Sequence, residues 1–187
     1  MSLIINKARN LLSVLKKKTC FSFRMRLLIL FTFLYMYAKQ LILCRILRIK
    51  LKTERIFGYK ISFFNYNDFL TIFKEVFMHS DYFFRVPDRA PVIIDCGSNI
   101  GVSVIYFKML YPDAAITAFE AHVPTYALLK RNIEANNIKG VTAVNRALHS
   151  RKSKKIWFYS DKSNPGALGM SIVKEKGGNN MKEAVIT

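Results

Sequence analysis

The most constraining feature of this 187-residue chain is the segment PVIIDCGSNIG at residues 91–101. Three consecutive apolar residues, Val92 to Ile94, lead directly into Asp95, and Gly97 and Gly101 follow. A short continuous apolar run of this kind is typical of a parallel strand that is buried on both faces. The two glycines predict a tight turn after the strand. The sequence therefore predicts a carboxylate at the C-terminal end of a buried strand.

Alternating helices and strands follow this turn. The pattern predicts, in order, a helix over residues 102–111, a strand over 115–119 that ends in Glu120, a helix over 124–136 and a strand over 141–145. This β-α-β-α-β order is the first half of a doubly wound sheet. The expected fold class is therefore α/β, with a Rossmann-like sheet that is incomplete at its C-terminal side.

The ends of the first two strands predict a site for a nucleoside-containing ligand, because ligands of such sheets bind beyond the carboxyl ends of the strands. Gly97 lets a ligand approach the backbone, and Glu120 can accept hydrogen bonds from a ribose. The spacing of Gly97 and Gly101 excludes a P-loop, and Asn99 replaces the second glycine of the dinucleotide fingerprint. Because Asp95 would repel a pyrophosphate, the turn favours a ligand with an ammonium group, such as S-adenosylmethionine (SAM).

Simpler interpretations of these residues stay open at this point. Asp95 could be only the N-cap of the next helix, and Glu120 could be a solvated strand end. His122 and His149 follow strand ends, where a base could act, but single surface histidines are usually inert. Three separated cysteines and the absence of a ligand cluster predict neither a disulfide scaffold nor a metal site. This cysteine usage fits a reduced, intracellular setting.

Three segments, in order, resemble the FkbM family of SAM-dependent methyltransferases: FKEVFMHSDYFF, PVIIDCGSNIGVSVIYFKMLYPDAAITAFEA and NRALHS. The resemblance covers residues 56–159 and implies a class I methyltransferase fold, SAM as cofactor and O-methylation of a sugar or other small metabolite. It places the glycine turn at the methionine end of SAM, Glu120 at the ribose and Ala147 at the adenine. The implied cofactor-binding residues are Asp95, Gly97, Ser98, Asn99, Gly101, Glu120, Ala121 and Ala147. No residue is identified as the catalytic base.

The chain departs from the family pattern at several positions. Cys96 and Ser98 replace an aliphatic residue and an alanine, and Ala121 replaces the proline after the acid. A further strand is expected over residues 155–160, but the family's later K-I-D-x-E-G-x-E motif is absent. We therefore expect a truncated methyltransferase, or a short form that pairs with another chain. The alternative is a non-catalytic, membrane-associated fragment that retains half of the SAM-binding fold.

The N-terminal third predicts a basic helical extension over residues 1–55, ahead of a partial methyltransferase domain over 56–187. Of the 30 Lys and Arg residues, 14 lie in residues 1–60, with one acidic residue beside them. Residues 3–18 have the spacing of a basic amphipathic helix, and residues 27–47 are largely apolar. Each segment could lie at an anionic membrane surface or pack on the domain, and the second could also span a bilayer.

The expected partners are a small-molecule or saccharide acceptor and, through residues 1–50, an anionic membrane surface. Nucleic acid is disfavoured because the cations lie among long aliphatic runs. The expected location is the cytoplasm, with peripheral attachment at the inner face of the membrane as an option. A secretory signal peptide is disfavoured because the apolar stretch begins late and lacks a small-residue cleavage site.

The aromatic-rich middle of the chain predicts a strand in GYKISFF, residues 58–64, followed by a helix that starts near Phe69. Asn67 or Asp68 is the expected cap of this helix. An apolar stripe predicts packing in the core; it consists of Phe69, Ile72, Phe73, Val76 and Phe77.

Overall fold

The computed structural model describes residues 21–148, together with the backbone of residues 155–161 and 180–186. The chain divides into two compact units: Met1–Leu51 with Asn65–Pro87, and Lys52–Phe64 with Asp88–Thr187. The division predicted from the sequence, with an extension over residues 1–55 and a domain over 56–187, stays a prediction. The helix expected over residues 3–18 lies outside the described residues.

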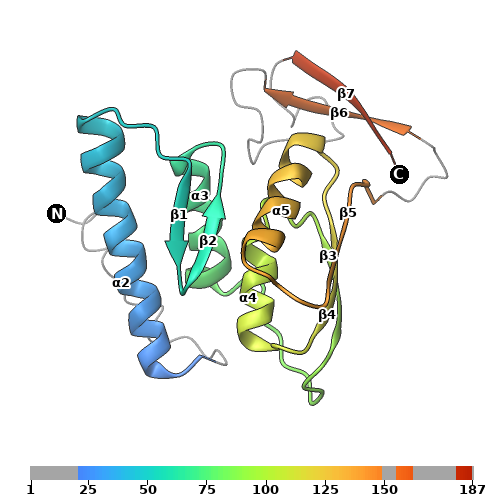
Figure 1. Ribbon diagram of the computed structural model, residues 1–187, viewed down its shortest axis with the longest axis horizontal. Helices are drawn as coiled ribbons and strands as arrows, with labels where there is room; N and C mark the ends of the chain where they lie inside the picture. Colours follow the sequence, from blue (N-terminus) through green and yellow to red (C-terminus); the bar gives the residue numbers. More distant parts are fainter. Residues whose placement is uncertain (1–20, 149–154, 162–179, 187) are drawn as a thin grey trace. The chain divides into compact units, whose positions relative to one another are not determined.

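In the described part of the first unit, two α-helices each continue into a π-helix (Figure 1). Helix α2, Phe23–Lys39, continues into the π-helix η1, Gln40–Ile46. Helix α3, Tyr66–Phe73, continues into the π-helix η2, Lys74–His79. The first helix begins at Ser22, whose hydroxyl oxygen accepts a hydrogen bond from the Met25 amide at 3.3 Å. A polar N-cap thus starts a helix that is otherwise almost wholly apolar.

Helix α3 begins earlier than the sequence predicts. Its N-cap is Asn65, whose side-chain oxygen accepts a hydrogen bond from the Asp68 amide at 2.8 Å. The expected caps, Asn67 and Asp68, lie inside the helix instead. The predicted apolar stripe is confirmed, because all five of its residues are buried: Phe69, Ile72, Phe73, Val76 and Phe77.

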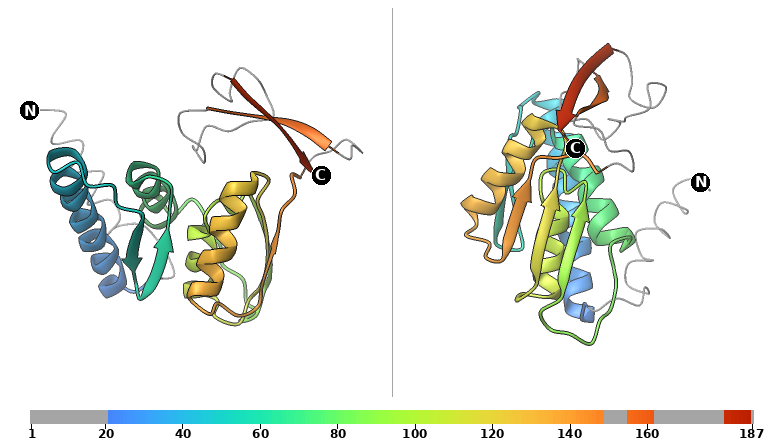
Figure 2. Two further views of the ribbon diagram at one scale, coloured as in Figure 1. Left: turned by 45° about the horizontal axis from the view of Figure 1, so that its top comes forward. Right: turned by 90° about the vertical axis from the view of Figure 1, so that its right-hand side faces the viewer.

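The second unit is built on a three-stranded parallel sheet in the order β3-β4-β5. Its strands are β3, Val92–Cys96, β4, Ala115–Phe119, and β5, Val141–Val144. The connecting helices are α4, Val102–Leu110, and α5, Val123–Ala135. Both helices lie on the same face of the sheet (Figures 1 and 2). The structure therefore confirms the β-α-β-α-β order and the α/β fold class.

The prediction that the first strand is buried on both faces is wrong. Ile93 and Asp95 are buried under the helices, whereas Val92 and Ile94 are 79% and 64% exposed on the other face. Strand β3 is also an edge strand of this sheet. The continuous apolar run therefore alternates between a covered and an uncovered face, since both connecting helices of the described chain pack on one side.

A β-hairpin lies on the outer side of the helix layer (Figure 1). It consists of β1, Thr53–Ile56, which the sequence analysis missed, and β2, Tyr59–Ser62. An asparagine of α5 and the asparagine that caps its C-terminus bind the hairpin backbone. Asn132 accepts a hydrogen bond from the Ser62 amide at 2.8 Å and donates one to the Ser62 carbonyl at 3.0 Å, and Asn136 pairs with Lys60 in the same way.

A second hairpin contains the last two described strands. Strand β6, Lys155–Asp161, confirms the strand expected over residues 155–160. It pairs antiparallel with β7, Asn180–Ile186, a strand that the sequence analysis did not predict. The two strands form a sheet of their own and do not extend β3-β4-β5.

Candidate functional site

Parallel pairing of β3 and β4 brings their carboxyl ends together. Asp95 is in register with Ala118, and Cys96 with Phe119, so Asp95 and Glu120 both lie at this edge of the sheet. The turn after β3 is then fixed to β4, because the Phe119 carbonyl accepts hydrogen bonds from the amides of Gly97 at 2.9 Å and Ser98 at 2.8 Å. The two acids that the sequence analysis singled out are therefore neighbours across one turn.

The glycine turn contains three residues with positive φ: Gly97 at 93°, Asn99 at 48° and Gly101 at 91°. A Cβ atom at Gly101 would lie 2.9 Å from the Leu129 side chain of α5, whereas a Cβ atom at Gly97 would meet no atom within 4 Å. Gly101 is thus required for close packing of α4 against α5. Gly97 leaves open space beside the backbone, which is the property that close approach of a ligand needs.

Asp95 is buried, with 6% of its surface exposed. One carboxylate oxygen accepts a hydrogen bond from the Ser103 hydroxyl at 2.7 Å, and the Ser98 hydroxyl donates to the Asp95 carbonyl at 3.2 Å. Burial raises the pKa of Asp95, and the hydroxyls of Ser103 and Ser98 partly offset this effect. The N-cap of α4 is Gly101, so the alternative that Asp95 only caps that helix is wrong.

Glu120 joins the turns that follow the two strands. Its two carboxylate oxygens accept hydrogen bonds from the amides of Asn99 at 3.0 Å and His122 at 2.8 Å. The side chain is 7% exposed, so the alternative of a solvated strand end is wrong. Burial raises the pKa of Glu120, backbone hydrogen bonds partly offset this, and the negative charge of Asp95 raises it slightly further. Two carboxyl groups therefore share one poorly solvated site.

Polar residues that the sequence analysis did not assign hold this site in place. Ser103 binds Asp95, as described above. The Asn145 side chain donates to the carbonyls of Glu120 at 2.8 Å and Ala121 at 3.1 Å, which ties the end of β5 to the end of β4. Asn132 donates to the Ile100 carbonyl at 2.8 Å and so fixes the glycine turn from α5. In the sequence, the only indication of these roles was that polar residues occur next to a strand end or among apolar helix residues.

The remaining predicted residues occupy different surroundings. Ala121 and Ala147 are partly buried, and Ala147 follows β5 in an irregular segment. His122 was expected to be a surface residue, but it is buried, and its Nδ1 lies 2.7 Å from the Thr125 hydroxyl. His149 lies outside the described residues. Within the described part of the chain, no group of three His, Cys, Asp or Glu side chains could hold a metal ion.

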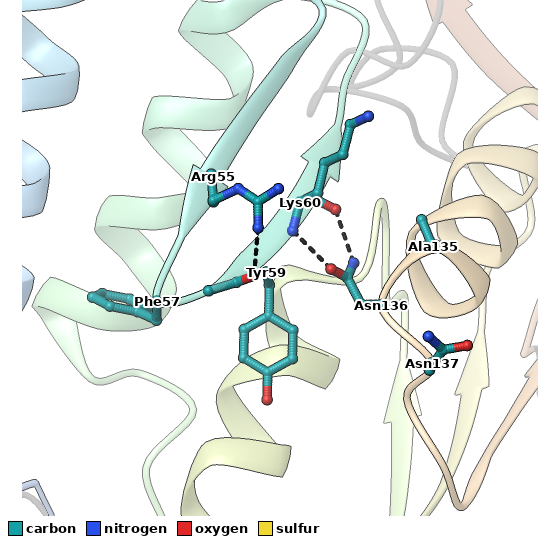
Figure 3. A pocket seen from close by; sticks show the side chains of 8 residues that line it. Arg55, Phe57, Tyr59, Lys60, Ala135, Asn136 and Asn137 are labelled. Carbon is teal, nitrogen blue, oxygen red and sulfur yellow. Dashed lines mark hydrogen bonds between the residues drawn. The ribbon is translucent and has the colours of Figure 1, made fainter.

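A polar pocket of about 450 Å³ lies elsewhere in the second unit (Figure 3). Its walls come from the turn between β1 and β2 and from the end of α5, and include Arg55, Tyr59, Lys60 and Asn136. Glu120 precedes α5 and binds the amide of its N-cap, His122, whereas the pocket lies at the C-terminal end of this helix. Since a 13-residue helix is about 20 Å long, the pocket is separate from the carboxylate site.

Comparisons with known proteins give partial matches. The chain is 39% identical over 77 residues to Methyltransferase 1 of Beauveria bassiana (strain ARSEF 2860), covering 38% of this chain and 29% of that protein. It is 39% identical over 80 residues to Methyltransferase sdnD of Sordaria araneosa, covering 42% and 31%. The chain thus spans about a third of the length of each curated relative. No family model matches it.

Two solved structures are distantly similar to the chain. One is M. jannaschii TYW2 in complex with AdoMet, with a TM-score of 0.37, 15% identity and coverage of 56% of this chain and 46% of that one. The other is P. horikoshii TYW2 in complex with MeSAdo, with a TM-score of 0.39, 14% identity and coverage of 64% and 51%.

Proposed function

We propose that the chain is part of a SAM-dependent methyltransferase of FkbM type, which O-methylates a sugar or another small metabolite. The observation that carries this proposal is the placement of two buried carboxylates, Asp95 and Glu120, on either side of a glycine turn at the ends of adjacent parallel strands. The 39% identity to two proteins named methyltransferase supports the same reaction class.

The residues of the site fit SAM on chemical grounds. SAM, when bound, supplies an electrophilic methyl group on a sulfonium centre. Glu120 already accepts two backbone hydrogen bonds, and a carboxylate has capacity for more, which suits the hydroxyls of a ribose. Asp95 contributes negative charge where an ammonium group would be favoured and a pyrophosphate would be repelled. The open space beside Gly97 leaves room for a ligand next to the turn.

The role of this chain in the reaction is to bind and orient the cofactor. In-line methyl transfer depends mostly on proximity and orientation of the two reactants. The rigid hydrogen-bonding of the turn by Phe119, Asn132 and Glu120 supplies a fixed binding surface. The acceptor class is supported only by the FkbM resemblance.

Calorimetric titration of the full chain with SAM tests the proposal, using Asp95→Asn, Glu120→Gln and a control, Glu134→Gln. Glu134 is an exposed carboxylate on α5, so its replacement removes the same charge away from the site. Each site variant should bind SAM about tenfold more weakly, because a hydrogen bond to a charged group is lost. Circular dichroism confirms that the variants fold. Equal affinity in all four proteins, or no binding by the parent chain, would contradict the proposal.

A further inference from the structure

The long helix formed by α2 and η1 has one face that packs within the first unit. Ile29, Leu30 and Met36 are at most 7% exposed, and the Phe33 ring stacks on Phe73 with 6.4 Å between the ring centroids. The Gln40 side chain donates a hydrogen bond to Asn67, which extends this contact into the π-helix. This face therefore packs against α3 and η2.

A second apolar face of the same helix is exposed to solvent. It consists of Leu28, Phe31, Tyr35, Ile42 and Ile46, which are 48%, 63%, 60%, 52% and 72% exposed. Steps of three and four residues place Leu28, Phe31 and Tyr35 on one side of α2, and Ile42 and Ile46 follow in the π-helix η1. We refer to these five residues as the α2 stripe. Scattered apolar residues are ordinary on a protein surface, but several large ones on one element mark an interaction site.

The charged residues in the segment that carries the α2 stripe are all of one sign. Arg24 and Arg26 lie in the first turn of α2, and Arg45 and Arg48 lie at the far end of the helix. Residues 21–53 contain no Asp or Glu. Lys39 lies along the helix between them, with its ammonium group 5.5 Å from the centre of the Tyr35 ring. A large apolar row bordered only by cations is complementary to an interface of acyl chains and anionic headgroups.

We infer that the α2 stripe binds the surface of a bilayer that contains anionic lipids, with the helix lying in the plane of the interface. The helix Phe23–Ile46 has 24 residues and contains an 18-residue window with a mean hydropathy of 1.8, so it is long and apolar enough to span a bilayer. Its opposite face, however, packs on α3 and η2, which carry exposed Lys74 and Glu75. A spanning arrangement would bring these charges into the hydrocarbon, whereas an interfacial arrangement leaves them in water.

Sedimentation of the full chain with vesicles tests this inference. Vesicles of phosphatidylcholine with about 30% phosphatidylglycerol should bind the chain at least tenfold more tightly than pure phosphatidylcholine. Phe31→Glu should weaken binding about tenfold or more, because it removes a large apolar group and adds a negative charge at the interface. Thr71→Glu is the matched control, since it adds the same charge at an exposed position of α3. It should change binding by less than about threefold.

Extraction with alkaline carbonate distinguishes a helix at the membrane surface from a helix that spans the bilayer. Vesicle-bound protein should be released by alkaline carbonate, as expected for a helix at the surface. Retention after carbonate would overturn the interfacial arrangement in favour of a span. Equal losses in Phe31→Glu and Thr71→Glu would show that charge alone drives binding and would overturn the role of the stripe. Absence of vesicle binding, with a dimer that Phe31→Glu disrupts, would assign the stripe to a second copy of the chain instead.

Discussion

The carboxylate site and the α2 stripe are opposite exceptions to the usual distribution of side chains, in which charged groups are exposed and large apolar groups are buried. At the site, charged side chains are buried, and each hydrogen bond that holds them comes from residues of the same unit. On α2, large apolar side chains are exposed, although the opposite face of the same helix packs well. A buried polar group and an exposed apolar row are the informative exceptions to the general pattern of protein surfaces.

The difference shows which groups find partners among the described residues. Both carboxylates of the site accept hydrogen bonds from residues of the second unit, so the fold itself orients them. The five side chains of the stripe are about half exposed or more, and the proposed membrane contact rests on this exposure. The following experiments test whether this contrast holds.

The largest loss of stability is expected from substitutions in the glycine turn. Gly97→Ala and Gly101→Ala carry the same backbone strain, because both glycines have φ near +90°. Only Gly101→Ala also places a methyl group 2.9 Å from Leu129, which is fully buried. We expect Gly101→Ala to lower the free energy of unfolding by about 2 kcal/mol more than Gly97→Ala, measured by urea denaturation. Equal losses would mean that packing of α4 on α5 does not set the turn.

The next largest loss of stability is expected at Asn132 of α5 and at its C-cap, Asn136. Asn132→Leu leaves the buried Ser62 amide and the Ile100 carbonyl without their hydrogen bonds and should lower the free energy of unfolding by about 2 kcal/mol. Asn136→Leu removes a matching pair of hydrogen bonds to Lys60, which is exposed, and should have a smaller effect. Chemical denaturation of both variants measures the difference. A larger loss in Asn136→Leu would contradict the importance of burial.

Asp95→Asn, in contrast, is expected to raise the free energy of unfolding. Because burial raises the pKa of Asp95, the folded state holds more protons than the unfolded state between the ordinary carboxyl range and that raised pKa. Stability therefore falls as the pH rises through this range. An amide keeps the hydrogen bond from Ser103 without the buried charge, so the variant should be more stable by about 1 kcal/mol at neutral pH. The gain should vanish below the ordinary carboxyl range, where Asp95 is protonated in both the folded and the unfolded chain.

Thermal unfolding as a function of pH measures this difference. A gain that does not depend on pH would show that the charge of Asp95 is not its cause.

The smallest change in the free energy of unfolding is expected from a substitution in the α2 stripe. Phe31→Ser should change the free energy of unfolding by less than about 0.5 kcal/mol, because the side chain is 63% exposed. Met36→Ala, on the packed face of the same helix, should lower it by about 2 kcal/mol or more. Denaturation without lipid compares the two variants. A large loss in Phe31→Ser would show that the stripe is covered within the folded chain.

Local patterns in the sequence were sufficient for much of the second unit. The run that leads to Asp95, the glycines after it and Pro124 in the first turn of α5 fix the strand–turn–helix order by short-range geometry. Burial of β3 on one face could not be predicted, because it depends on which helices cover the sheet. The network around the site was missed for a similar reason. Asn132, Asn145 and Ser103 reach their partners only through the tertiary fold, and isolated polar residues in a sequence give little sign of this.

Hydrogen–deuterium exchange of the full chain, with and without SAM, tests the central claim most directly. We predict that SAM slows exchange at the amides of Gly97 to Gly101 and at His122, which surround the two carboxylates. Exchange at Tyr59 and Lys60, in the separate polar pocket, should stay unchanged. Protection confined to that pocket, or no protection at the glycine turn at a saturating SAM concentration, would contradict the assignment of the site.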